Sequence, residues 1–187
     1  MTTEGKMRYV VVDLEATCWN GEVDRSRSEI IEIGAVLMCS AQGEIVREFS
    51  SFIRPVLEPK LSDFCRQLTT ITQEQVDQAD SFPAVFPRFV DWIGDEPFFL
   101  CSWGAYDLNQ FRLDCTRHEI ELPETFERHI NLKKEFSRTM RVGPCGMSKA
   151  LRITKLQLEG THHRGIDDAK NIAKLARLIL PKLKDVA

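Results

Sequence analysis

Short apolar runs and longer stretches of helical spacing follow one another along this chain. Residues 8–17, RYVVVDLEAT, are rich in valine and predict a first, buried strand. Two more strands are expected in EIIEIGAVLMCS (29–40) and EIVREFSSFIRP (44–55), and the intervening AQGE suits a hairpin turn. The first part of the chain therefore predicts a meander of three strands.

Strands and helices alternate in the remainder of the chain. A fourth strand is expected in PFFLCSW (97–103), and HINLKKEF (129–136) predicts a short fifth one. Pro181 ends the last of the predicted helices, and Thr72 with Gln75 resembles a capping box. Helices are expected in residues 81–96, 104–120, 146–156 and 165–181, and residues 61–79 hold polar and helical pieces. This order predicts an α/β domain of three layers around a mixed sheet.

The length of 187 residues suits one domain, which we expect over residues 1–187 with its core at about 8–181. No apolar run is long enough to cross a bilayer, and the N-terminus lacks the layout of a signal peptide. The six cysteines are scattered without a C-x-x-C pair, which favours free thiols over disulfides or a zinc site. These features predict a cytoplasmic protein without a membrane partner.

The net charge of −3 argues against a protein that coats nucleic acid through its overall charge. The charge is uneven, however, because residues 133–155 hold seven Lys and Arg residues against one Glu. Such a segment either guides a polyanion toward an acidic pocket or is a solvated loop and helix face. The segment alone supports both interpretations.

Two carboxylates emerge near the end of the first predicted strand. Because side chains alternate along a strand, Tyr9, Val11, Asp13 and Glu15 share one face. Two buried like charges are costly unless they share a cation, and carboxylate oxygens suit Mg²⁺ or Mn²⁺ better than zinc. The alternative is that the strand simply ends in solvent, since D-x-E alone is a weak signal.

A third carboxylate, Asp107, lies in the first turns of the helix expected after the fourth strand. It borders an apolar stripe formed by Leu108, Phe111 and Cys115. An acidic residue at such a position commonly only complements the helix dipole. Taken alone, Asp107 favours that interpretation.

The segment THHRGIDDAKN (161–171) holds two histidines and two aspartates at a constant offset of five residues. On a helical wheel Asp168 falls beside the apolar face, whereas Asp167 falls among polar residues. These polar residues are Lys170, Asn171, Lys174 and Arg177. We therefore expect Asp168 to face the interior and Asp167 to be solvated. The offset pairs Asp168 with His163 rather than His162, although a lone loop histidine is more often exposed or part of a helix cap.

Together these segments supply four carboxylates, from a strand and two helices, and a histidine on an approach loop. A two-metal hydrolytic site needs acidic ligands for two divalent ions about 3.5–4 Å apart and a base for the attacking water. In-line displacement at a phosphodiester is the reaction that such a site serves. The combination therefore predicts a nuclease.

The ordered motifs DLEAT (Asp13, Glu15), WGAYD (Asp107) and HRGIDDA (His163, Asp168) resemble the DEDD-type 3′-to-5′ exonucleases of the histidine subclass. The stretches DLEATCW, EIIEIGAV, LSDFCRQLTTITQEQV, SFP, WGAYDLNQF and GIDDAKNIA are most similar to the Eri-type exoribonucleases and the sporulation-inhibitor KapD group. The similarity runs from about residue 9 to residue 180. One departure is Gly165, where many relatives in the wider superfamily have alanine.

The resemblance implies a ribonuclease-H-like fold, a five-stranded mixed sheet flanked by helices. It implies that Asp13, Glu15 and Asp168 hold one divalent ion, Mg²⁺ or Mn²⁺. Asp13 would also reach a second ion, and Asp107 would bind at the periphery. His163 would be the general base that takes a proton from the attacking water. A further nucleic-acid-binding domain, which animal members often carry, is not expected in a chain of this length.

The implied activity is hydrolysis of nucleic acid from its 3′ end, with RNA the expected substrate. Trp103 and Phe64, with Trp19 behind them, would stack on the terminal nucleotide, although core packing explains each of them equally well. Backbone groups around Ala16 and Thr17 would meet the terminal sugar and phosphate. The basic residues between Lys133 and Lys155 would follow the upstream backbone.

Two alternatives stay open beside an exoribonuclease. One is a DNA exonuclease of the same superfamily, and the other is a catalytically silent nucleic-acid-binding module with the same fold. The presence of all five site residues argues against the silent module.

Overall fold

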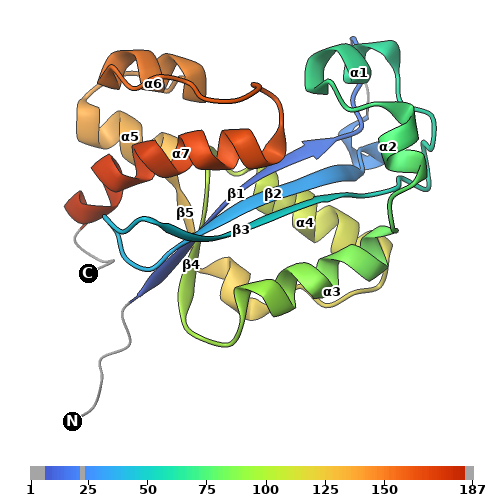
Figure 1. Cartoon of the computed structure of the whole chain (residues 1–187), viewed down its shortest axis with the longest axis horizontal. Coiled ribbons are helices and arrows are strands. Elements are labelled where there is room, and N and C mark those ends of the chain that lie inside the picture. Colours follow the sequence, from blue (N-terminus) through green and yellow to red (C-terminus); the bar gives the residue numbers. More distant parts are fainter. Residues whose placement is uncertain (1–6, 22–23, 184–187) are drawn as a thin grey trace.

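The computed structural model describes residues 7–21 and 24–183 as a five-stranded sheet between layers of helices (Figure 1). The strand order is β3-β2-β1-β4-β5. Strand β1 pairs antiparallel with β2 and parallel with β4, so the sheet is mixed. The strands are β1 (Arg8–Ala16), β2 (Ile30–Met38), β3 (Ile45–Phe52), β4 (Phe98–Ser102) and β5 (His129–Asn131). The predicted fold class, a three-layer α/β domain with a five-stranded mixed sheet, is confirmed.

Helices α5, α6 and α7 cover one face of the sheet, and α3 and α4 cover the other (Figure 1). The helices are α1 (Asp63–Thr69), α2 (Gln73–Asp77), α3 (Phe82–Ile93), α4 (Tyr106–Arg117), α5 (Leu132–Met140), α6 (Met147–Thr154) and α7 (Gly165–Ile179). Short 3-10 turns occur at Arg25–Arg27, Glu124–Glu127 and Leu180–Lys182. Within the described ranges, no helix combines the length and the apolar character that crossing a membrane requires.

Strand β1 contributes to the cores on both faces of the sheet because its side chains alternate. Tyr9 and Val11 pack in the core formed with α5, α6 and α7. Val10 and Val12 pack in the phenylalanine-rich core formed with α3 and α4. Asp13 follows Val11 on the face that α7 covers, so the predicted alternation is confirmed and directs Asp13 toward the start of α7.

Two local predictions from the sequence are confirmed. Thr72 and Gln75 form a capping box at α2, because each side chain accepts a hydrogen bond from the other residue's backbone N–H. The hairpin between β2 and β3 turns where the Gly43 N–H donates to the Ser40 carbonyl at 3.0 Å.

Helix α5 was not expected from the sequence, which predicted only a short strand in 129–136. The strand β5 has three residues, and α5 begins directly after it. Asn131 ends the strand and also caps the helix, because its side-chain oxygen accepts the Lys134 N–H at 3.0 Å. Leu132 and Phe136, both buried, give the helix its apolar stripe, but a stripe of so few residues is too short to stand out in the sequence.

Helix α7 begins in direct contact with the sheet, and two glycines make this approach possible. A Cβ on Gly34 of β2 would lie 1.9 Å from the Gly165 carbonyl carbon and 2.0 Å from the Ile166 nitrogen. A Cβ on Gly165 would lie 2.9 Å from the Gly34 backbone nitrogen and 3.0 Å from the backbone carbonyl oxygen of Asp13. The departure from alanine at Gly165 thus has a local cause, since its neighbours leave little room for a methyl group.

Replacing Gly34 by alanine should therefore force α7 away from the sheet. We expect Gly34→Ala to lower the free energy of unfolding by about 3 kcal/mol, because the new methyl group would collide with backbone atoms. Gly143→Ala is the matched control: a Cβ there meets nothing within 4 Å, and the expected change is within about 0.5 kcal/mol. Urea unfolding measures both, and equal midpoints for the two variants would contradict the packing argument.

Candidate active site

A hollow of about 560 Å³ at the start of α7 contains the predicted catalytic residues. Asp13, Glu15, Asp107, His163 and Asp168 all line it. One carboxylate oxygen from each of Asp13, Glu15 and Asp168 lies within 4.8 Å of the others. Residues that are distant in the sequence, on β1, α4 and α7, therefore present their acidic groups to one space.

Asp107 is tied to β1 from the other face of the sheet. It is only 5% exposed, and its Oδ1 accepts the Leu14 N–H at 3.0 Å. Asp107 lies in the first turn of α4, where it can complement the helix dipole as its position alone favoured, and the contact with Leu14 gives it a second role. Its carboxylate contacts the backbone of Leu14, the residue between Asp13 and Glu15 in the sequence, a position that the sequence could indicate only through the combined motifs.

Burial of several carboxylates in one space raises their pKa values. The pKa of Asp13 lies well above its usual range, first because of burial and then because of the charge of Asp107. Burial, with Asp168 next, raises the pKa of Glu15 to about 8. Burial also raises the pKa of Asp107 to about 6, although the hydrogen bond from Leu14 opposes this shift. These acids repel one another unless a cation balances them.

The donor set fits a divalent metal ion. The oxygens of Asp13, Glu15 and Asp168 are hard ligands, and their mutual repulsion is what a bound cation removes. An all-carboxylate set favours ions such as Mg²⁺ or Mn²⁺ over softer transition metals. The residues present therefore fit the metal chemistry that the sequence predicted.

The two neighbouring histidines contact Asp168 in different ways. The ring of His162 donates through Nδ1 to Asp168, with distances of 2.9 and 3.1 Å to the two carboxylate oxygens. The His162 Nε2 is hydrogen-bonded to the Ser148 Oγ at 3.0 Å. His163 instead donates its backbone N–H to Asp168 at 2.9 Å. The predicted pairing of Asp168 with His163 therefore holds only for the backbone N–H of His163, and the side chain that contacts Asp168 is that of His162.

The ring of His163 stacks on that of His162, with centroids 4.0 Å apart, and lines the hollow. Burial lowers the pKa of His163; the charge of His162 adds to this effect and Asp168 opposes it. The backbone of His163 has a φ of 64°, in the left-handed region that non-glycine residues seldom adopt. The hydrogen bond to Asp168 and the stacking on His162 help to maintain this conformation of the loop.

The prediction that Asp168 faces inward is confirmed, since only 3% of it is exposed. The predicted solvent exposure of its neighbours needs correction. Asp167 is half-buried and accepts the Thr161 N–H at 2.8 Å. Asn171 is fully buried and exchanges hydrogen bonds with the backbone of Glu159. The helical wheel missed this because the segment before the histidines folds back over α7.

The aromatic residues expected to contact substrate are divided among three places. Trp103 lines the acidic hollow and donates from Nε1 to the Cys145 carbonyl at 3.0 Å. Trp19 lines an adjoining hollow of about 310 Å³, together with Thr17. Phe64 is 38% exposed on α1 and is not among the residues that line either hollow.

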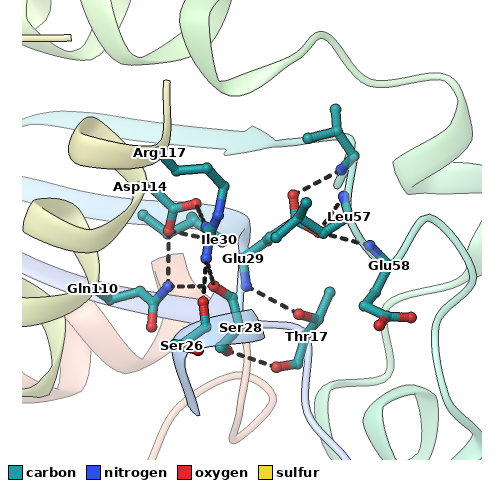
Figure 2. A network of polar contacts seen from close by, with 11 residues as sticks. Thr17, Ser26, Ser28, Glu29, Ile30, Leu57, Glu58, Gln110, Asp114 and Arg117 are labelled. Carbon is teal, nitrogen blue, oxygen red and sulfur yellow. Dashed lines mark hydrogen bonds and ion pairs between the residues drawn. The ribbon is translucent and has the colours of Figure 1, made fainter. Parts of the chain in front are cut away.

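Thr17 and the neighbouring Ala16 are buried, and the polar atoms of Thr17 are engaged within the protein (Figure 2). The Thr17 N–H donates to the Glu29 carbonyl at 2.8 Å, and Oγ1 accepts the Glu29 N–H at 3.0 Å. The Ser28 hydroxyl donates to the Thr17 carbonyl at 2.7 Å. Thr17 therefore builds the wall of the adjoining hollow, and its backbone N–H is already paired.

The same polar network anchors α4 and the segment before α1 (Figure 2). The Glu29 carboxylate accepts the N–H groups of residues 56–58 at 2.8–2.9 Å. On α4, Asp114 accepts hydrogen bonds from Gln110 and from the Ile30 N–H and forms an ion pair with Arg117. These contacts hold the helix that carries Asp107 against the start of β2.

The residues around the hollow include several that were not singled out from the sequence. Tyr106, 44% exposed, lines both hollows and immediately precedes Asp107. Ser148, Lys149 and Arg152 of α6 line the acidic hollow and belong to the basic segment 133–155. The charge of that segment was the only signal for them, and it could not say which of its residues face the acids.

This chain is similar to known proteins over most of its length. Residues 10–176 match the RNase_T family, described as exonuclease. The chain is 34% identical over 175 residues to the human protein named 3′-5′ exoribonuclease 1, covering 89% of this chain and 50% of that protein. It is 35% identical over 189 residues to the mouse protein named ERI1 exoribonuclease 2, covering 89% of this chain and 28% of that protein. The chain thus spans about half, or less, of these relatives.

A solved structure, the nuclease domain of 3′hExo, a DEDDh family member bound to rAMP, has a TM-score of 0.87. It shares 31% sequence identity, and the alignment covers 97% of this chain and 94% of that domain. Cell-death related nuclease 4 has a TM-score of 0.86 at 26% identity, with 95% of this chain and 64% of the other covered.

The raised pKa of Glu15 predicts how stability depends on pH without metal. Its folded value of about 8 exceeds the usual 4.5, so the folded protein binds this proton more tightly than the unfolded chain does. Stability is then highest below the unfolded value and falls as the pH rises toward the folded value. In EDTA we expect the free energy of unfolding to fall by about 3 kcal/mol between pH 5.5 and 8.5.

Urea unfolding at the two pH values measures this difference. Glu15→Gln, which removes the titrating group, should flatten the dependence, and Mg²⁺ or Mn²⁺ should stabilise the parent more at pH 8.5 than at pH 5.5. An unchanged pH dependence in Glu15→Gln would show that the repulsion lies elsewhere.

Proposed function

The chain belongs to the exonuclease family matched by its residues 10–176, and we propose that it is a metal-dependent 3′-to-5′ exonuclease that acts on RNA. The observation that carries the proposal is the meeting of Asp13, Glu15, Asp107 and Asp168 in one hollow. The fold contributes these acids from β1, α4 and α7. The names of the relatives, both exoribonucleases, and the rAMP bound to the similar nuclease domain support RNA as the substrate.

The proposed chemistry is hydrolysis of the terminal phosphodiester with two divalent ions, Mg²⁺ or Mn²⁺. When bound, the ions balance the negative charge that develops on the phosphate oxygens and orient the attacking water. Asp13, Glu15 and Asp168 would hold one ion, with Asp13 shared by the second and Asp107 at the periphery. The raised pKa values of Asp13 and Glu15 support this assignment, because a cation is what makes these buried carboxylates stable in their charged form.

His163 is the proposed general base. Its lowered pKa keeps the ring neutral near pH 7, and a neutral imidazole can accept the proton of the attacking water. The ring lines the hollow and rests against His162. We assign His162 a supporting part, since Ser148 and Asp168 already engage both of its ring nitrogens.

The 3′-terminal nucleotide would lie across the acidic hollow and the adjoining one. Trp103 and Tyr106 offer aromatic surfaces beside the acids, and Trp19 offers one in the second hollow. Phe64, which lines neither hollow, would contact the nucleotide only where it extends beyond them, while Thr17, next to Ala16, lines the second hollow. Lys149 and Arg152, which face the acids from α6, would hold the phosphates of the upstream backbone.

We propose that residues 1–187 form one exonuclease domain and that the protein works in the cytoplasm. The free thiols of all six cysteines, four of them buried, agree with a reducing compartment.

Digestion of 5′-labelled single-stranded RNA with Mg²⁺ or Mn²⁺ tests the function. A ladder of shortening labelled products is expected, and EDTA should abolish it. Asp13→Ala should lower the rate on the order of 10³-fold or more, because it removes a proposed ligand of the metal ions that stabilise charge in the transition state. Asp91→Ala, an exposed acid on α3, is the matched control and should leave the rate unchanged.

A matched DNA oligonucleotide in the same assay separates the alternatives. Faster digestion of DNA than of RNA would favour a DNA exonuclease. RNA that stays intact after long incubation with Mn²⁺ would favour the catalytically silent module, and full activity in Asp13→Ala would show that the site is wrongly assigned.

The histidine doublet gives a second prediction. His163→Ala should lower kcat on the order of 10²–10⁴-fold, the usual contribution of a general base. His162→Ala should cost far less, about tenfold, since its ring orients Asp168 and does not take the proton. Single-turnover digestion of RNA measures both, and equal losses would refute the choice of His163.

A further inference from the structure

Glu32 of β2 is a fully buried carboxylate that the proposed reaction does not use. Its exposed fraction is 0%, and it lies opposite the metal-site residue Glu15 in the pairing of β1 with β2. Its two oxygens accept hydrogen bonds from the Arg164 Nε and Nη2, both at 3.2 Å. A third donor is the Gly165 N–H, at 3.0 Å. A buried charge of this kind needs such partners, and all three come from the segment beside the histidines.

Arg164 is held by a second contact as well. Its guanidinium lies over the ring of Phe52 on β3, 5.2 Å from the centroid, while its side chain is 24% exposed. The planar fork can meet both carboxylate oxygens and stack on an aromatic ring at the same time, which an ammonium cannot do. Arg164 thus fixes the segment before α7 to two strands of the sheet.

These contacts hold Arg164 and Gly165, the two residues that directly follow the proposed base His163. His163 has a φ of 64°, and such a conformation persists only where neighbouring structure maintains it. On one side its N–H is bonded to Asp168. On the other side, the next two residues, Arg164 and Gly165, are bonded to Glu32.

We propose that Glu32 and Arg164 form a latch that positions the His163 loop for proton transfer, an inference that rests on the proposed function. Both are positioning residues, since their charged groups face each other and act through the backbone of the loop. A buried ion pair is weak evidence for stability, because desolvation offsets most of its attraction. What the ion pair contributes is a defined geometry for the backbone of the loop, rather than stability.

Kinetics of the full chain test the latch. Glu32→Gln and Arg164→Gln should each lower kcat by about 30-fold, within the range expected for misplacing a reacting group by about 1 Å. KM for an RNA oligonucleotide should change less than about twofold, because neither residue lines the hollow that would hold the substrate. Arg164→Lys keeps the charge and should recover part of the loss. Arg177→Gln on α7, which breaks an ion pair with the exposed Glu44 just before β3, is the matched control and should leave kcat unchanged.

A double-mutant cycle separates the latch from a general structural effect. In a His163→Ala background, Glu32→Gln should cause little further loss, since the residue through which the latch acts is already absent. A loss as large as in the parent would overturn the proposal.

Amide hydrogen exchange gives a readout that does not depend on activity. Arg164→Gln and Arg164→Lys should speed exchange at residues 162–165 and leave the amides of β1 unchanged. Exchange that is equally slow in the parent and in both variants would overturn the latch, even if Glu32→Gln fails to fold. An inactive parent would refute the proposed nuclease while this measurement still decides whether Glu32 and Arg164 hold the loop.

Discussion

The contact between Gly34 and Gly165 is the constraint on which the site depends. It brings the first turn of α7 against the sheet at Asp13, so that Asp168 meets the acids of β1. Alanine at Gly34 would place a Cβ inside the backbone of α7, and the helix would have to move outward. The site is therefore assembled by a packing contact between two backbones, and the acidic residues themselves oppose its formation.

Because these acids repel one another, each needs a positive partner, and the partners differ from one acid to the next. Buried carboxylates raise one another's pKa, and Glu32 adds a further charge opposite Glu15. The chain balances Glu32 internally with Arg164, whereas the described contacts offer Asp13 and Glu15 no arginine or lysine. The difference separates a carboxylate with a structural partner from carboxylates kept for a cation.

Sequence patterns were most informative where one local period decides the structure. The alternation along β1 placed Asp13 and Glu15 correctly, and the helical wheel selected Asp168 as the buried aspartate. Helix α5 was missed because its apolar stripe is short. Asn171 was predicted to be exposed, but the segment before the histidines folds back over it. Tyr106 and the side of α6 that faces the acids depend on tertiary packing, which no local period reports.

The position of β1 at the centre of the sheet has a consequence for how such a site can vary. Odd-numbered residues supply one core and the acids, and even-numbered residues supply the other core, so a shift of one position would exchange the two sets. The spacing of Asp13 and Glu15 is thereby fixed by the hydrophobic cores on both sides. Elements that pack on a single side, such as α6, leave more room for changes that tune preference among substrates.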